Sequence, residues 1–182
     1  MAPSVRRFSE YLSASDLRLT RFAQQLSHRP WGLNYFAAVS RLGDGIAWYC
    51  LMLLLLLFGG EVGQQAALQM AVVGLSSLVL YKGLKWMSKR PRPLAVERSL
   101  QTRVAPLDEF SFPSGHTLHA VAFTLVATTH IPELGILLWP FCASVAMSRV
   151  ALGLHYPSDV LAAIGLGWCL SAGSTALMFD HL

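Results

Sequence analysis

Long apolar stretches are the feature that most constrains the fold of this chain. Hydrophobic residues make up 54% of its 182 residues and charged residues only 13%, which is far from the balance of an average soluble domain. A helix needs about twenty mostly apolar residues to cross a bilayer, and four or five stretches approach that length. They lie at residues 45–58, 66–84, 116–129, 134–151 and 159–179. We therefore predict an all-α integral membrane protein, a bundle of about five spanning helices.

The first thirty residues follow a different pattern. Apolar residues recur there at steps of three, four and seven, and three arginines fall on the opposite side of the helix that this spacing predicts. The apolar residues are Phe8, Leu12, Leu19, Phe22 and Leu26, and the arginines are Arg7, Arg18 and Arg21. Because the segment is too charged to span, we expect an amphipathic helix over residues 1–30 that lies in the membrane interface or packs on the rest of the protein. Residues 31–182 then form one membrane domain.

Polar residues gather in three clusters, each at an end of an apolar stretch. The clusters are Lys85 with Arg92 and Pro93, then Pro113-Ser114-Gly115-His116, then Ser148-Arg149 with His155 and Asp159. Charge is costly beside a membrane, so its presence at these positions indicates a functional site. The connections at residues 59–63 and 131–133 are short, which makes neighbouring helices antiparallel and brings all three clusters to one side. Residues 85–113 contain several prolines and are expected to form a loop with short helical turns over that site.

Three cations in these clusters predict a pocket that binds an anion. Arg92 and Arg149 can each donate two parallel hydrogen bonds to a phosphate, and Lys85 supplies a mobile point charge. The Ser114 hydroxyl and the backbone N–H groups from Gly115 onward stand where a helix is expected to begin, and the unpaired N–H groups of a helix start favour an anion. These groups together suit a phosphate.

The third cluster holds a histidine and a carboxylate at helical spacing. His155 and Asp159 are four residues apart, so one helical turn would bring the carboxylate to one imidazole nitrogen and leave the other free to attack phosphorus. Pro157 lies between them and fits only near the first turn of a helix, so the spacing alone does not fix the geometry.

Simpler roles account for other polar residues. We expect Lys82, Lys89 and Arg90 to be interfacial anchors, and His119 and His130 to be hydrogen-bonded core residues.

Three cysteines, Cys50, Cys142 and Cys169, lie inside apolar stretches. They form neither a C-x-x-C pair nor a zinc-type cluster, so we predict no metal site and no cofactor.

The motifs K-x6-R-P, P-S-G-H and S-R-x5-H-x3-D resemble those of the type 2 phosphatidic acid phosphatase (PAP2) family, lipid phosphate phosphatases related to vanadium haloperoxidases. The resemblance covers about residues 40–173. It implies that His155 is the nucleophile and forms a phosphohistidine, that Asp159 orients it, and that His116 is the general acid. It also implies metal-independent chemistry and a phosphate held by Lys85, Arg92, Ser114, Gly115 and Arg149.

Two further features concern the same resemblance. Many members of the family have six spanning helices, whereas this chain offers an interfacial helix in place of the first. The stretch Ser40-Arg41-Leu42-Gly43-Asp44-Gly45 also resembles one that is common in bacterial members. Its simplest role is to begin a helix.

The resemblance implies a membrane-embedded hydrolase that acts on a phosphomonoester or diphosphate. A site at headgroup level favours an amphiphile whose tail stays among the helices, and undecaprenyl diphosphate, phosphatidylglycerophosphate and phosphatidate all fit. Two alternatives stay open: a phosphotransferase acting on lipid or sugar acceptors, and a non-catalytic lipid-binding relative. The expected partners are the lipid phosphate substrate and membrane lipids, without nucleic acid.

The distribution of basic residues bears on orientation. All 14 Lys and Arg residues lie in the N-terminal region or near the catalytic face, and the positive-inside rule places that face in the cytoplasm. The family resemblance instead places it outside. Both orientations stay open for a multi-pass protein of the inner (plasma) membrane.

Overall fold

Helices account for the regular structure of this chain. The computed structural model describes residues 3–25, 27, 29–97, 99–100, 102 and 104–179. Apart from one isolated bridge between Pro91 and Phe110, the regular elements of these residues are helical, which confirms the all-α prediction. In chain order they are α1 (Pro3–Gln25), α2 (Pro30–Arg41), η1 (Leu42–Ile46), α3 (Ala47–Phe58), α4 (Gly60–Ser88), α5 (Pro93–Val96), α6 (Gly115–His130), η2 (Pro132–Leu134), α7 (Gly135–Ala151) and α8 (Pro157–Phe179).

Four helical segments of the described chain are long and apolar enough to cross a membrane, so the protein is a multi-pass membrane protein. They are Trp31–Phe58, Gly60–Ser88, Pro132–Ala151 and Pro157–Met178. The first is longer than the predicted stretch at residues 45–58, because α2 continues through η1 into α3. The remaining predicted span, at residues 116–129, corresponds to α6, which has only 16 residues. The expected number of about five helices therefore agrees with the structure.

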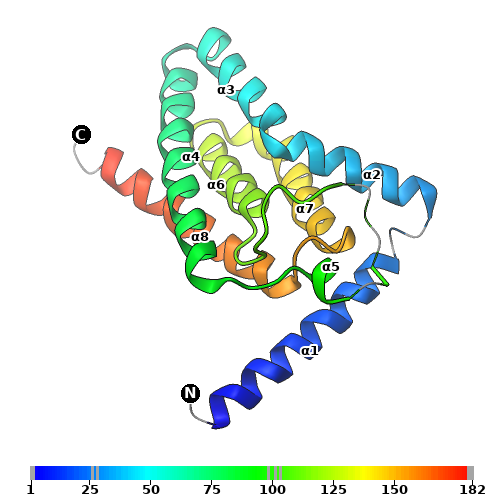
Figure 1. Cartoon of the computed structure of the whole chain (residues 1–182). Coiled ribbons are helices and arrows are strands. Elements are labelled where there is room, and N and C mark those ends of the chain that lie inside the picture. Colours follow the sequence, from blue (N-terminus) through cyan, green and yellow to red (C-terminus); the bar gives the residue numbers. More distant parts are fainter. Residues whose placement is uncertain are drawn as a thin grey trace.

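Helix α6 is the centre of the bundle. It packs against α4, α7 and α8 (Figure 1), and Ala120, Ala122 and Val126 are fully buried. Small residues on its neighbours allow close approach: a Cβ atom at Gly167 of α8 would lie 2.9 Å from the Leu118 carbonyl oxygen. Because α6 is surrounded by protein, it does not need the apolar length of a helix that faces lipid.

Helix α1 turns its polar side toward the protein. Asp16, Thr20 and Gln24 are buried, whereas Leu19 and Phe22 are 54% and 67% exposed. The apolar stripe, where the structure describes it, therefore does not pack on the bundle. The side chains of Phe8, Leu12 and Leu26 lie outside the described residues. An interfacial location for α1, with Leu19 and Phe22 toward lipid, remains the prediction that this orientation favours.

The loops divide between two ends of the bundle. The turns that join α3 to α4 and α6 to α7 lie at one end (Figure 1). At the other end lie α5, the segment that leads into α6, and the turn between α7 and α8 (Figure 1). The three polar clusters belong to this second end, as the antiparallel arrangement predicts.

Candidate active site

One pocket of about 810 Å³ brings most of the predicted site residues together. Six of the eight line it, and they come from α4, the segment before α5, the start of α6, the end of α7 and the turn that follows. These six are Lys85, Arg92, Gly115, His116, Arg149 and His155. The other two, Ser114 and Asp159, lie behind its wall and are fully buried.

The turn between α7 and α8 places His155 beside the cations. The chain folds back after α7 because Gly153 adopts a positive φ of 66°, a conformation that glycine accepts without steric cost. The backbone N–H groups of Leu154 and His155 then both donate to the Arg149 carbonyl oxygen, each at 3.0 Å. This fold-back aligns the imidazole with the pocket.

His155 is held as a neutral imidazole with one nitrogen available. Its Nδ1 donates to the Ser111 carbonyl oxygen at 2.6 Å, and a carbonyl can only accept, so the lone pair is left on Nε2. Nε2 lies 3.2 Å from Nη1 of Arg92. Burial, and then the charges of Arg149, Arg92 and Lys85, hold the pKa of His155 well below its usual value. Because a guanidinium can only donate, the Nε2 lone pair accepts from Arg92, and a neutral imidazole that keeps this lone pair is the form that a nucleophile requires.

Asp159 does not make the contact that its spacing predicts. Its Oδ2 is 3.7 Å from Nδ1 of His155, beyond hydrogen-bond distance, and accepts instead from the Tyr156 backbone N–H at 2.9 Å. Because α8 begins only at Pro157, His155 lies before the helix and the four-residue spacing does not bring the two side chains together. The Ser111 carbonyl is therefore the group in direct contact with the imidazole.

Arg90 corrects one prediction, because it is not an interfacial anchor. Its guanidinium donates to Asp159 Oδ1 at 2.6 Å, Asp16 Oδ2 at 2.7 Å and Ser158 Oγ at 2.8 Å, and it lies over the Tyr156 ring at 4.1 Å. Burial alone would lower the pKa of Arg90, but the two carboxylates outweigh burial and raise it. Arg90 thus joins α1 to the carboxylate behind the nucleophile.

Replacing Arg90 by alanine is expected to destabilise the protein. Removal of one partner from a buried ion pair costs about 3–5 kcal/mol, and Asp16 and Asp159 would both lose their cation. Because the Arg90 side chain is 23% exposed, we expect the lower end of that range, about 3 kcal/mol. Thermal unfolding in detergent measures the change, with the exposed Arg18→Ala on α1 as the control. Equal melting temperatures for the two variants would contradict the proposed link.

Asp108 lines the pocket, and the sequence patterns do not reveal it. Its carboxylate accepts from Lys85 Nζ at 2.6 and 2.8 Å and from Arg92 Nη2 at 2.6 Å. Burial raises the pKa of Asp108, but hydrogen bonds and charge from Lys85 and Arg92 outweigh burial and lower it. The two cations can therefore share one anion, and Asp108 stands in that position. No motif or spacing marks this residue within its loop.

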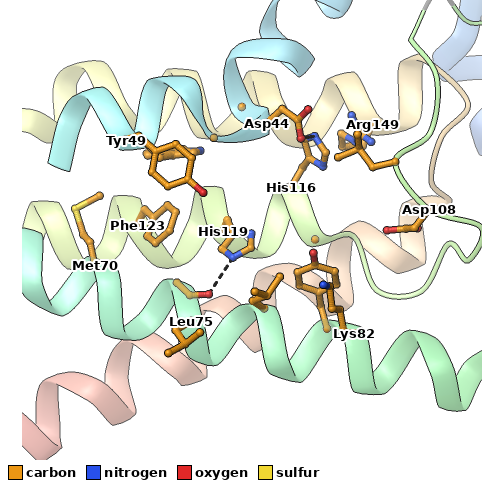
Figure 2. Close-up of a pocket in the computed structure, with 18 of the residues that line it drawn as sticks. Asp44, Tyr49, Met70, Leu75, Lys82, Asp108, His116, His119, Phe123 and Arg149 are labelled. Atoms are coloured by element: carbon orange, nitrogen blue, oxygen red, sulfur yellow. Dashed lines mark hydrogen bonds and ion pairs between the residues drawn. The ribbon is translucent and has the colours of Figure 1, made fainter. Parts of the chain in front are cut away.

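Arg149 presents a donor without a partner. Its side chain is buried and lines the pocket; Nη1 donates to the Ser40 hydroxyl. Nε has no hydrogen-bond partner, and a buried unpaired N–H is costly. Figure 2 shows Arg149 beside His116 and Asp44, with His116 Nε2 3.1 Å from Asp44 Oδ1. An anion in the pocket would compensate the buried charge of this guanidinium.

Ser114 caps helix α6. Its Oγ accepts from the Thr117 backbone N–H at 3.5 Å and lies 3.0 Å from Thr117 Oγ1. Its own backbone N–H donates to the Asp159 carbonyl oxygen at 3.3 Å. Ser114 therefore supports the wall of the pocket, while Gly115 lines it.

Away from the cations the pocket is apolar. Trp48, Met52, Met70, Leu75 and Phe123 line this part, and Figure 2 shows Met70 and Leu75 at the opposite side from Asp108. The pocket thus combines a basic end with an apolar extension among α3, α4 and α6. Such a shape suits an amphiphile with an anionic head.

The two remaining membrane histidines have partners in the bundle. His119 Nε2 lies 3.2 Å from the Gly74 carbonyl oxygen, and His130 Nε2 lies 2.7 Å from Gln69 Oε1, which confirms that both are hydrogen-bonded. The predicted core location is wrong, because His119 lines the pocket and His130 is only half-buried at the end of α6. In the part of the chain that the structure describes, no group of three His, Cys, Asp or Glu side chains is arranged to hold a metal ion.

Comparisons with known proteins agree on one family. The sequence model of the PAP2 superfamily matches residues 66–182. The chain is 29% identical over 122 residues to undecaprenyl-diphosphatase BcrC of Bacillus subtilis, covering 65% of this chain and 61% of the relative. It is 35% identical over 80 residues to phosphatidylglycerophosphatase B of Escherichia coli, covering 37% of this chain and 29% of the relative. The matches thus span about three fifths of the first relative and under a third of the second.

Solved structures share the fold along most of the chain. A transmembrane PAP2 type phosphatidylglycerolphosphate phosphatase from Bacillus subtilis superimposes with a TM-score of 0.74 at 25% identity, covering 93% of this chain and 87% of that one. Aquifex aeolicus LpxE gives a TM-score of 0.75 at 24% identity, covering 87% of this chain and 93% of that one. The second likeness concerns the fold alone.

Proposed function

This chain belongs to the PAP2 superfamily, and from that premise we propose that it is a membrane phosphatase that hydrolyses a lipid phosphomonoester or diphosphate. One observation carries the proposal: a single pocket holds a neutral, oriented imidazole beside three buried cations and continues into an apolar extension. The cations fit a phosphate and the extension fits a lipid tail.

Binding of the phosphate uses the three cations. Lys85 and Arg92 would exchange the Asp108 carboxylate for phosphate oxygens, and the Arg149 guanidinium would donate to another oxygen. The N–H groups at the start of α6 add positive potential from the side of Gly115. These donors are fixed before substrate arrives, so they can stabilise the charge that gathers on the oxygens in the transition state.

The reaction then proceeds through His155. Nε2 attacks phosphorus, the N–P bond forms as the bond to the ester oxygen breaks, and His116 protonates that oxygen. The product of this step is a phosphohistidine on His155. Water then attacks phosphorus, His116 takes its proton, and inorganic phosphate leaves. In this mechanism Ser111 fixes the tautomer of His155, and Asp159 stabilises the charge that develops nearby.

The substrate is proposed to be a lipid phosphate of bacterial type. The relatives described above are named for undecaprenyl diphosphate and for phosphatidylglycerophosphate. A further relative, from Mycobacterium tuberculosis, is named decaprenylphosphoryl-5-phosphoribose phosphatase; it is 29% identical over 153 residues, which cover 81% of this chain and 81% of the relative. Undecaprenyl diphosphate, phosphatidylglycerophosphate and phosphatidate are therefore the compounds to test on this chain.

Dependence on the lipid tail tests the proposal. A tail that buries about four methylenes contributes roughly 3 kcal/mol, so kcat/KM for phosphatidate should exceed that for glycerol 3-phosphate by about 100-fold. Phosphate release from both compounds by the purified chain in detergent gives the comparison. Equal values would contradict a role for the apolar extension, and phosphate recovered on an added alcohol instead of in solution would indicate a phosphotransferase.

We also propose that the protein resides in the inner (plasma) membrane. The end that holds the pocket carries Arg18, Arg21 and Lys89, all exposed, and the positive-inside rule favours this end in the cytoplasm. Cytoplasmic orientation would give the site access to lipid phosphates of the inner leaflet.

A further inference from the structure

We propose that Asp44 is a positioning residue for His116, an inference that rests on the proposed phosphatase activity. Asp44 Oδ1 lies 3.1 Å from His116 Nε2, and Figure 2 shows the two side chains facing each other within the pocket. A carboxylate at this distance attracts the protonated ring, limits its orientation and stabilises the imidazolium. Nδ1 of His116, which makes no hydrogen bond within the described residues, is then left to protonate the leaving oxygen.

The backbone around Asp44 departs from a regular helix. Leu42–Ile46 form a kink between α2 and α3, and Gly45 within it has a φ of 126°, which is open to glycine but strained for other residues. A Cβ atom at Gly43 would lie 2.9 Å from the Val145 side chain, so α7 also packs closely here. This kink brings the Asp44 carboxylate into the pocket.

The simpler role of beginning a helix does not account for this segment. The residues that precede η1 and α3 are Arg41 and Ile46, and neither element has a side-chain cap. Ser40 and Asp44 instead contact groups of the site: the Ser40 hydroxyl accepts from Arg149, and Asp44 pairs with His116. This short segment thus contacts both Arg149, which is proposed to bind the phosphate, and His116, which is the proposed acid.

Two substrates that differ in how much their leaving group needs a proton can distinguish a positioning role of Asp44 from a structural one. Lipid alkoxides are poor leaving groups and require the general acid, whereas p-nitrophenolate leaves without a proton. For Asp44→Asn we expect the rate of the first step with phosphatidate, phosphorylation of His155 measured in a single turnover, to fall about 100-fold, the lower range of general acid catalysis. The half-saturating substrate concentration should stay unchanged, and the single-turnover release of p-nitrophenol from p-nitrophenyl phosphate should stay within about threefold of the unmodified chain, because His116 acts as a base only after that step.

A double variant connects the effect to His116. If Asp44 acts through the imidazole, Asp44→Asn combined with His116→Ala should be no slower on phosphatidate than His116→Ala alone. Glu61→Gln makes the same chemical change at an exposed position near the start of α4 and should leave both substrates unaffected. Inhibition by orthovanadate, measured for each variant, should be unchanged and reports an intact anion pocket.

Several outcomes would overturn the inference. Equal losses of the first-step rate on both substrates, a rise in the half-saturating concentration without a change in that rate, or additive losses in the double variant would each show that Asp44 does not act through His116. Loss of vanadate inhibition in Asp44→Asn would show that the carboxylate maintains the pocket instead. Failure of the unmodified chain to hydrolyse either compound would refute the phosphatase activity itself, which is a different result.

Discussion

Replacing His155 by alanine is expected to remove phosphate release almost completely, with kcat reduced by about 10⁴-fold or more. The imidazole supplies the only atom in the proposed mechanism that bonds to phosphorus before water does. Its Nε2 lone pair is directed by the Ser111 carbonyl and lies beside Arg92. An alanine leaves the cations to bind phosphate but offers no nucleophile, so substrate should bind without reacting.

The matched control for this prediction is His130→Ala. His130 is also a histidine of the helical bundle and is hydrogen-bonded to Gln69, but it ends α6 away from the pocket. It should keep nearly full activity. A base-quenched reaction with labelled substrate should trap phosphohistidine on the unmodified chain and on His130→Ala, and none on His155→Ala. Substantial turnover by a folded His155→Ala protein would refute the assigned nucleophile.

The helices could be predicted from the sequence because membrane spans depend on local composition. Length and hydropathy alone mark α4, α7 and α8, since each of these helices faces lipid along much of its surface. Helix α6 is harder to predict, because its short length is acceptable only when other helices surround it. The kink at η1 depends on packing between α2 and α7, so residues 45–58 alone indicate a shorter span than the structure has.

The site could be predicted only where residue type and spacing fall in one segment. His155, the proposed nucleophile, and the three cations belong to recognisable motifs, and the pocket does bring them together. Arg90 and Asp16 lie 74 positions apart, and His155 and Ser111 lie 44 apart, so no local pattern connects them. The same reason hides Asp44 and Asp108: each carboxylate has meaning only through cations and imidazoles that distant segments supply.

Arg149→Lys is expected to lower kcat/KM by about 10²–10³-fold, although the charge is kept. Loss of one fixed donor to a transition-state oxyanion has an effect of that size. The Arg149 side chain is 2% exposed and serves two positions, because its Nη1 donates to Ser40 and the residue also lines the pocket. An ammonium group is a point charge and cannot occupy both positions. An ammonium group that donates to Ser40 would not reach the phosphate. One that reaches the phosphate would deprive the buried Ser40 hydroxyl of its hydrogen-bond donor.

Two companion variants separate this geometric effect from a general sensitivity to the substitution. Arg41→Lys makes the same change at an exposed position at the end of α2 and should keep full activity. Ser40→Ala removes only the group that holds the guanidinium, so a smaller loss, about tenfold, is expected because the fork stays but is no longer fixed. We therefore predict that kcat/KM, measured on one lipid phosphate, is highest for Arg41→Lys, intermediate for Ser40→Ala and lowest for Arg149→Lys. If Arg149→Lys retains as much activity as Ser40→Ala, positive charge alone is sufficient at this position and the planar fork has no role in holding the phosphate.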